Sequence, residues 1–205
     1  EFMYKEYAVY QPLQRRGVLD AESIERLRTS SYFTSNSSIF NETDFEQLKE
    51  MNPRSAADEK KYQKYLAGQQ FVADVLTILE ANRSDQMFMD YGEFEKYLKS
   101  LLGKVEGMSA SRLTGIAMVL AVMDKTAVVQ KDRKGEIVKD TTTKDTEIIK
   151  LTQDPEKYFE AEVYPHVPDA IWTYEFDPKK KESATNKEKL GAEFPFTRFF
   201  YEYKE

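Results

Sequence analysis

The longest helical pattern in the chain lies at residues 55–82, which read SAADEKKYQKYLAGQQFVADVLTILEAN. Its first half is charged and its second half is apolar. Phe71, Val75 and Leu79 recur every four residues, so they share one face of a helix. Gly68 favours a break at the middle of the segment. The pattern therefore predicts one or two helices whose apolar half packs into a core.

Further helical patterns lie on both sides of this segment. Residues 90–105 and 109–122 are apolar at helical spacing, and Ser109 is a suitable cap for the second. Earlier in the chain, Asp20 caps a predicted helix at 21–29, and Asn41 caps another that continues to about Met51. We expect a polar loop at 30–38. The three apolar helices should pack together as a bundle.

The two ends of the chain indicate strands. Residues 3–13 are rich in Tyr and Val and predict a strand, which Pro12 should end or restrict to a sheet edge. Near Gly135, residues 127–130 and 136–139 flank a five-residue turn and predict a hairpin. A further short strand is predicted at 147–151, a helix at 154–164 and an aromatic strand at 194–203. Residues 177–189 are expected to be a loop.

These elements predict an α+β fold, mainly a helical bundle with a small antiparallel sheet or hairpin. We divide the chain into a strand segment at 1–19, the bundle at 20–123, and a hairpin, short helix and C-terminal aromatic strand at 124–205. We expect the last segment to form one compact unit with the bundle.

The composition excludes several classes of protein. The chain has 205 residues and a net charge of −6, which argues against a basic module that coats DNA. It has no cysteine, so we expect no disulfide framework and no thiolate zinc site, as is typical of a cytoplasmic protein. Its longest apolar run, 116–123, is far shorter than the roughly 20 residues of a membrane span. It begins at Glu1, without a signal peptide or an initiator methionine, which suggests an excised piece of a larger protein.

Four short motifs carry the most information about function. Residues 2–15 read FMYKEYAVYQPLQR, residues 123–127 read MDKTA and are followed by DTE at 145–147, residues 163–172 read VYPHVPDAIW, and residues 191–201 read GAEFPFTRFFY. In order and spacing they resemble the C-terminal region of the modification subunit of type I restriction-modification systems. The chain departs from the commoner pattern of that family at Ile171-Trp172, where Trp-Ile is usual, and in a longer lysine-rich insertion before Gly191.

The resemblance implies that the parent protein is a site-specific, adenine-specific DNA methyltransferase. Such an enzyme transfers a methyl group from S-adenosylmethionine to adenine N6. It works on duplex DNA, in a complex with specificity and restriction subunits and without a membrane. Its region after the methylase core would be an accessory or docking element.

The motifs that would perform this chemistry are missing from the chain. There is no Gly-x-Gly, so no glycine-rich turn is predicted for S-adenosylmethionine. The Asn-Pro-Pro-aromatic motif that holds a flipped adenine is also missing, because Asn52-Pro53 is followed by Arg54. We therefore predict that the chain itself is inactive and has no catalytic, cofactor-binding or metal-binding residues.

Five side chains are candidates for DNA or subunit contact: His166, Arg198, Lys179, Lys180 and Lys181. Each also has a structural interpretation. His166, the single histidine, suits a half-buried position in a proline-bounded turn. Arg198 lies among phenylalanines, where it can stack, pair with Asp169 or reach a phosphate. The lysines form a run that is typical of a solvated loop, and any DNA contact they make would depend on salt.

Aromatic side chains at both ends of the chain form a predicted docking surface for the missing core or a partner subunit. Its members are Tyr4, Tyr7, Tyr10, Phe196, Phe199 and Tyr201. The same residues are also compatible with an ordinary core.

Two further interpretations of the function remain open. The chain is alternatively a stand-alone, non-enzymatic interaction or scaffold module, which the upstream reading frame would distinguish. An independent nucleic-acid-binding domain would show micromolar affinity for duplex DNA that falls steeply with salt, and the acidic net charge argues against it.

Overall fold

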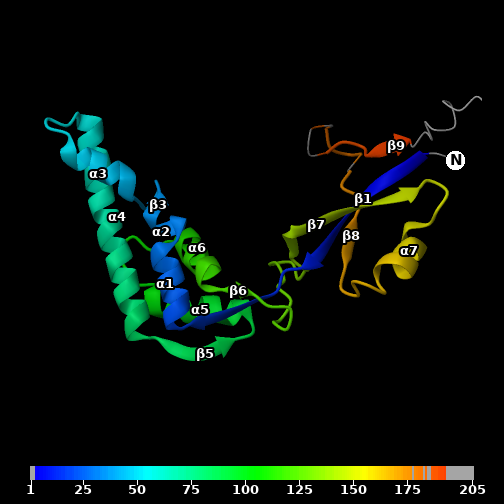
Figure 1. Cartoon of the computed structure of the whole chain (residues 1–205), viewed down its shortest axis with the longest axis horizontal. Helices are drawn as coiled ribbons and strands as arrows, with labels where there is room; N and C mark the ends of the chain where they lie inside the picture. The colour runs from blue at the N-terminus through cyan, green and yellow to red at the C-terminus, as the bar shows by residue number, and fades with distance from the viewer. Residues whose placement is uncertain (1–2, 177, 182, 184–185, 193–205) are drawn as a thin grey trace, which may run out of the picture. The chain divides into compact units, whose positions relative to one another are not determined.

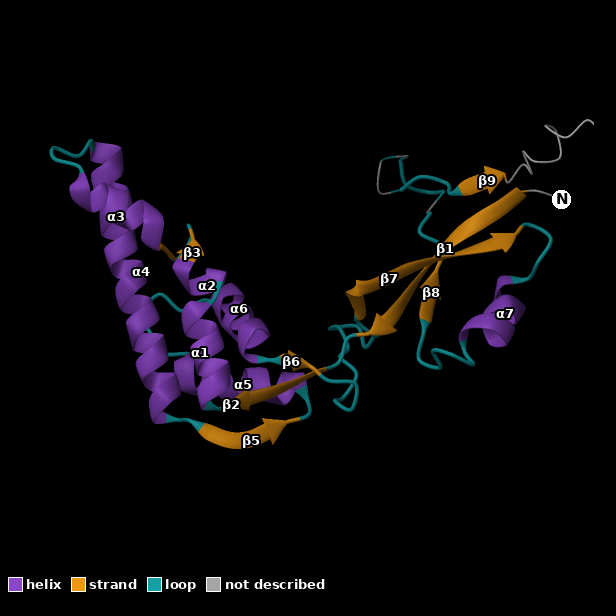
Figure 2. Ribbon diagram, in the orientation of Figure 1, coloured by secondary structure: helices purple, strands orange, loops and turns teal. Residues whose placement is uncertain are grey.

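The computed structural model describes residues 3–176, 178–181, 183 and 186–192 and has an α+β fold. The chain forms two compact units. Unit 1 comprises residues 1–13 and 131–205, and unit 2 comprises residues 14–130. Most helices belong to unit 2 and the longest strands belong to unit 1 (Figure 1, Figure 2).

Unit 2 contains the helices predicted before residue 123, together with α2, which was not predicted. Their bounds are α1 Ala21–Thr29, α2 Ser31–Thr34, α3 Glu42–Glu50, α4 Ala56–Ala81, α5 Tyr91–Leu102 and α6 Ala110–Leu120. The side chains of Asp20, Asn41 and Ser109 accept hydrogen bonds from the first turns of α1, α3 and α6 and so satisfy backbone N–H groups that have no partner within the helix. These predicted caps are confirmed.

Helix α4 is continuous, so the break expected at Gly68 does not occur. Gly68 is buried against the turn before β4 (Phe40–Asn41), where the Ile39 carbonyl oxygen lies 1.9 Å from the position that a Cβ atom would take. The glycine is therefore explained by close packing rather than by a helix end. The apolar face of α4 joins the core of unit 2 through Phe71, Val75 and Leu79.

Five short strands complete unit 2. β2 (Arg15–Leu19) pairs with β5 (Ser84–Phe88) on one side and with β6 (Val122–Met123) on the other. β3 (Ser35–Asn36) pairs with β4 in a separate ribbon. The prediction of a loop at 30–38 was wrong, because α2 and β3 lie in that segment. Phe33 and Ile39 are each 1% exposed, and their burial fixes that segment against the bundle.

Unit 1 is built on one antiparallel sheet. β1 (Met3–Pro12) is its central strand, with β7 (Lys139–Lys150) on one side and both β8 (Ile171–Thr173) and β9 (Leu190–Ala192) on the other. The predicted N-terminal strand is confirmed, and Pro12 is its last residue. β7 replaces the short strand predicted at 147–151, and a register shift opposite Val9–Gln11 absorbs its extra residues.

One face of this sheet is covered by a short helical segment. α7 (Pro155–Tyr158) begins at the predicted Asp154 cap and continues into the π-helical turn η1 (Phe159–Val163). Phe159 is fully buried; its ring stacks on Trp172 at 4.9 Å and packs edge-on against Tyr7. These aromatic contacts form the core of unit 1.

The hairpin near Gly135 is shorter than predicted. The turn is present and is closed by a bridge between Lys131 and Ile137. Residues 127–130 do not continue it: Val129 bridges Gln14, and the N–H of Val128 donates to the carbonyl oxygen of Met89. The division of the chain thus differs from the expected 1–19, 20–123 and 124–205, because pairing of β1 with β7 groups the N-terminus with residues after Gln130.

Candidate docking surfaces

Parts of all four motifs come together in the sheet of unit 1, whereas residues 123–127 of the second motif lie in unit 2. Tyr7, Ala8 and Val9 lie opposite Glu147, Thr146 and Asp145. On the other side of β1, Val9 lies opposite Trp172 and Tyr10 opposite Ile171, while Tyr4 lies opposite Gly191. Segments from four distant parts of the sequence therefore form one hydrogen-bonded structure.

Two carboxylates of the second motif, Glu147 and Asp124, have structural partners. The hydroxyl of Tyr158 donates to the Glu147 carboxylate at 2.8 Å, which ties α7 to β7. This hydrogen bond, together with burial, raises the pKa of Tyr158 to about 12. In the first part of the same motif, the Asp124 carboxylate accepts from the backbone N–H of Thr126 at 2.8 Å and pairs with Arg16 at 2.9 Å. The hydrogen bonds from Thr126, followed by the charge of Arg16, lower the pKa of Asp124.

Two members of the predicted docking surface belong to the core. Tyr7 and Tyr10 are 8% and 7% exposed, so neither ring is free to meet a partner of unit 1. Tyr7 packs against Phe159 and Trp172. Tyr4 is half-buried, and its ring lies over Gly191, where a Cβ atom would collide with it. Phe196, Phe199 and Tyr201 lie outside the described residues.

Tyr10 takes part in a polar cluster that was not predicted from the sequence. Its hydroxyl donates to the carboxylate of Glu175, which also accepts from Lys144 Nζ at 2.7 Å and Lys189 Nζ at 3.4 Å. The hydrogen bonds from Lys144 and then Tyr10 lower the pKa of Glu175 to about 2. Because its members come from β1, β7 and the segments flanking β8 and β9, the cluster links the strands of the sheet.

The candidate DNA contacts do not form one described site. His166 is exposed in the turn between η1 and β8, and its backbone N–H donates to the Val163 carbonyl oxygen. Its predicted half-burial was therefore wrong. Lys179, Lys180 and Lys181 are exposed, and the carbonyl oxygens of Lys180 and Lys181 accept from the Asn186 side chain. Arg198 lies outside the described residues, so its predicted pairing with Asp169 stays a prediction.

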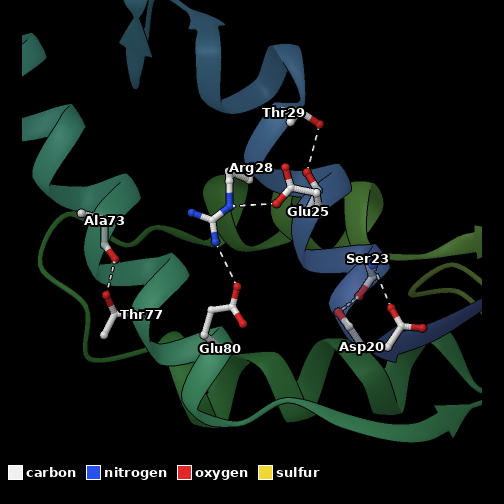
Figure 3. A network of polar contacts seen from close by, with 8 residues as sticks. All are labelled: Asp20, Ser23, Glu25, Arg28, Thr29, Ala73, Thr77 and Glu80. Atoms are coloured by element: carbon white, nitrogen blue, oxygen red, sulfur yellow. Dashed lines mark hydrogen bonds and ion pairs between the residues drawn. The ribbon is translucent and has the colours of Figure 1, made fainter.

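Unit 2 has a groove of about 720 Å³ between α1, α2 and α4. Its lining combines apolar and charged side chains, among them Phe33, Phe40, Val72, Leu76, Arg28 and Glu80. Figure 3 shows Arg28 directed between Glu25 and Glu80, to which it donates at 3.1 and 2.9 Å. An apolar floor with a charged rim is typical of a protein–protein interface.

Gly17, the only glycine of β2, lies against a packed side chain. The space beside it is filled by the Phe94 ring, which a Cβ atom would approach to 2.1 Å, so this glycine serves close packing. No group of three or more His, Asp or Glu side chains within the described ranges is placed to hold a metal ion.

Sequence reasoning missed Glu175 and the groove. Glu175 lies three residues after Trp172, the last residue of the third motif, and belongs to no motif itself. The groove has contributions from residues between Arg28 and Glu80, which only the packing of α1 and α2 on α4 brings together. Phe33 was the sequence signal for the groove, because it is an apolar residue within the segment predicted to be a polar loop.

Comparison with known proteins gives no relative: no family model, curated protein or solved structure matches the chain. Across the part of the chain that the structure describes, no helix is long and apolar enough to cross a membrane.

Proposed function

We propose that the chain is the C-terminal accessory and docking region of the modification subunit of a type I restriction-modification system. The parent would be a cytoplasmic DNA methyltransferase that uses S-adenosylmethionine to modify adenine N6. Its partners would be the specificity and restriction subunits and duplex DNA. The catalytic and cofactor-binding residues would lie elsewhere in the parent, so the chain supports methylation without performing it.

The pairing of the motifs in one sheet carries this proposal. Chance matches to short motifs would have no reason to meet in space. Here the Tyr-Ala-Val of the first motif lies directly opposite the Asp-Thr-Glu of the second, and Trp172 and Gly191 of the others pair with the same strand. This arrangement supports the view that these parts of the motifs belong to one structural unit, as expected for a family signature, while residues 123–127 of the second motif lie in unit 2.

We assign the docking role to the groove of unit 2. Its apolar lining would receive apolar side chains of a partner subunit. Among its charged lining residues, the two carboxylates Glu42 and Glu80 outnumber the cation Arg28, so a segment of the specificity subunit with basic and apolar residues would be complementary.

The upstream reading frame tests the proposal. We expect it to encode a glycine-rich strand–turn–helix motif followed by Asn-Pro-Pro-aromatic, because an adenine methylase needs both. A start codon just before this chain, with neither motif preceding it, would contradict the proposal and favour a stand-alone interaction module. Direct binding of S-adenosylmethionine by the 205-residue chain, measured by calorimetry, would also contradict it.

A further inference from the structure

Residues 131–144 of unit 1 carry an excess of positive charge. They contain five cations, Lys131, Arg133, Lys134, Lys139 and Lys144, against the three carboxylates Asp132, Glu136 and Asp140. The chain as a whole has a net charge of −6, so this basic ribbon differs from the remainder. Such a local concentration of charge can act on a polyanion even when the whole protein is acidic.

The turn at the tip of the ribbon is held by several hydrogen bonds. The N–H of Asp132 donates to the Glu136 carbonyl oxygen at 2.8 Å, and the N–H of Gly135 donates to the Asp132 carbonyl oxygen at 3.0 Å. Gly135 has a φ of 85°, a backbone conformation that glycine adopts without strain. The turn is thus preorganised, which lowers the entropy cost of binding through it.

Two of the three carboxylates are directed onto the backbone. Asp132 accepts from the N–H groups of Lys134 and Glu136 at 2.8 and 2.9 Å. Asp140 is 4% exposed and accepts from the N–H of Thr142 at 3.0 Å. Each carboxylate therefore stabilises a turn through its Oδ1 atom, and neither forms an ion pair within the described ranges.

The cations of the tip are available by contrast. Lys131, Arg133 and Lys134 are exposed, and within the described ranges none of them forms an ion pair. Elsewhere in the chain, Arg16 and Arg28 are held by carboxylates at 2.9 Å. The turn thus presents three unpaired cations on a rigid backbone.

We propose that the turn at residues 131–135 contacts the phosphate backbone of duplex DNA, with Arg133 and Lys134 as the contacting side chains. The inference rests on the proposed function, in which DNA is the substrate of the assembly. Phosphate oxygens are bound by Arg, Lys and backbone groups without regard to sequence, so exposed cations on a turn closed by the bridge between Lys131 and Ile137 suit such a contact. The contact orients the duplex and does not read its sequence.

Binding of fluorescein-labelled 20-base-pair DNA, measured by anisotropy at salt concentrations from about 20 to 200 mM, tests this contact. The double variant Arg133→Gln/Lys134→Gln should bind about tenfold more weakly at low salt. Its log–log salt dependence should be shallower by about 1.8, because each lost phosphate contact removes about 0.9 from the slope. The matched control is Lys60→Gln/Lys104→Gln, which removes two exposed cations from unit 2 and should bind as the unchanged chain does.

Three results would overturn the proposal: equal weakening by the two double variants, no binding at the lowest salt, or tighter binding of single-stranded RNA than of duplex DNA. The test is independent of the reading-frame experiment. If the DNA-binding test fails, the upstream reading frame can still encode the methylase motifs. If the reading frame lacks those motifs, the DNA affinity measured for the chain is unchanged.

Discussion

At position 68, packing rather than helix propensity decides which residue is tolerated. Replacing glycine by alanine in the middle of a helix usually stabilises it by about 0.5–1 kcal/mol. In α4, the new methyl group would collide with the Ile39 carbonyl oxygen, which belongs to the backbone and cannot rotate away.

We therefore expect Gly68→Ala to lower the free energy of unfolding by about 1–3 kcal/mol, as overpacked sites do. Urea unfolding followed by circular dichroism at 222 nm measures this. Lys60→Ala, at an exposed position of the same helix, should change stability by less than about 0.5 kcal/mol. A more stable Gly68→Ala variant would show that the 39–40 turn moves aside.

Glu175 makes the stability of unit 1 depend on pH. Hydrogen bonds from Lys144 and Tyr10 lower its pKa from 4.5 to about 2, so the folded state favours the ionised carboxylate. Its stabilising contribution is fully present above about pH 4.5 and is lost as the pH falls toward 2. We expect Glu175→Gln to be less stable than the unchanged chain at pH 7, with a deficit that shrinks between pH 4.5 and 2.

Thermal unfolding at a series of pH values checks this, with Trp172 fluorescence as the signal. Glu160→Gln, which changes an exposed carboxylate of the same unit, serves as the control and should show no deficit at pH 7. A deficit for Glu175→Gln that stays constant down to pH 2 would mean that its charge contributes nothing.

At the scale of elements, the sheet of unit 1 depends on the aromatic face that packs against η1. Tyr7 lies at its centre, with its ring against Phe159, Trp172 and Tyr174. We expect Tyr7→Ala to destabilise unit 1 by about 3–5 kcal/mol, because a large buried ring is lost. Tyr7→Phe keeps the ring and should cost less than about 1.5 kcal/mol. Denaturant unfolding followed by Trp172 fluorescence compares the two.

The two Tyr7 variants also separate a core role from a docking role. If Tyr7 served only a partner, Tyr7→Ala would leave the stability of the isolated chain unchanged and weaken assembly alone. Its 8% exposure argues for the core.

For the whole molecule, we expect two unfolding transitions. The chain passes between the units only twice, after residue 13 and after residue 130, and each unit has its own hydrophobic core. Trp172, the single tryptophan, reports on unit 1, while most of the helical signal comes from unit 2. Tyr7→Ala should shift the fluorescence transition, and Gly68→Ala should shift the circular dichroism transition. Coincident transitions that both variants shift together would show a single cooperative unit.

The sequence by itself determined most of the local structure. Helical spacing of apolar residues and the caps Asp20, Asn41 and Ser109 specified α1, α3, α5 and α6 within a few residues, because these signals act within one or two turns. It also determined the α+β class and supplied the motifs on which the proposed function rests.

Only the tertiary structure decided which segments meet. The continuity of α4 at Gly68, the burial of Phe33, the Glu175 cluster and the placement of β1 between β7 and β8 depend on residues far apart in the chain. The pairing of Val9 with both Asp145 and Trp172 joins positions more than a hundred residues apart. No local propensity encodes such contacts, since they form only when the burial of apolar surface and the pairing of backbone hydrogen bonds are satisfied together.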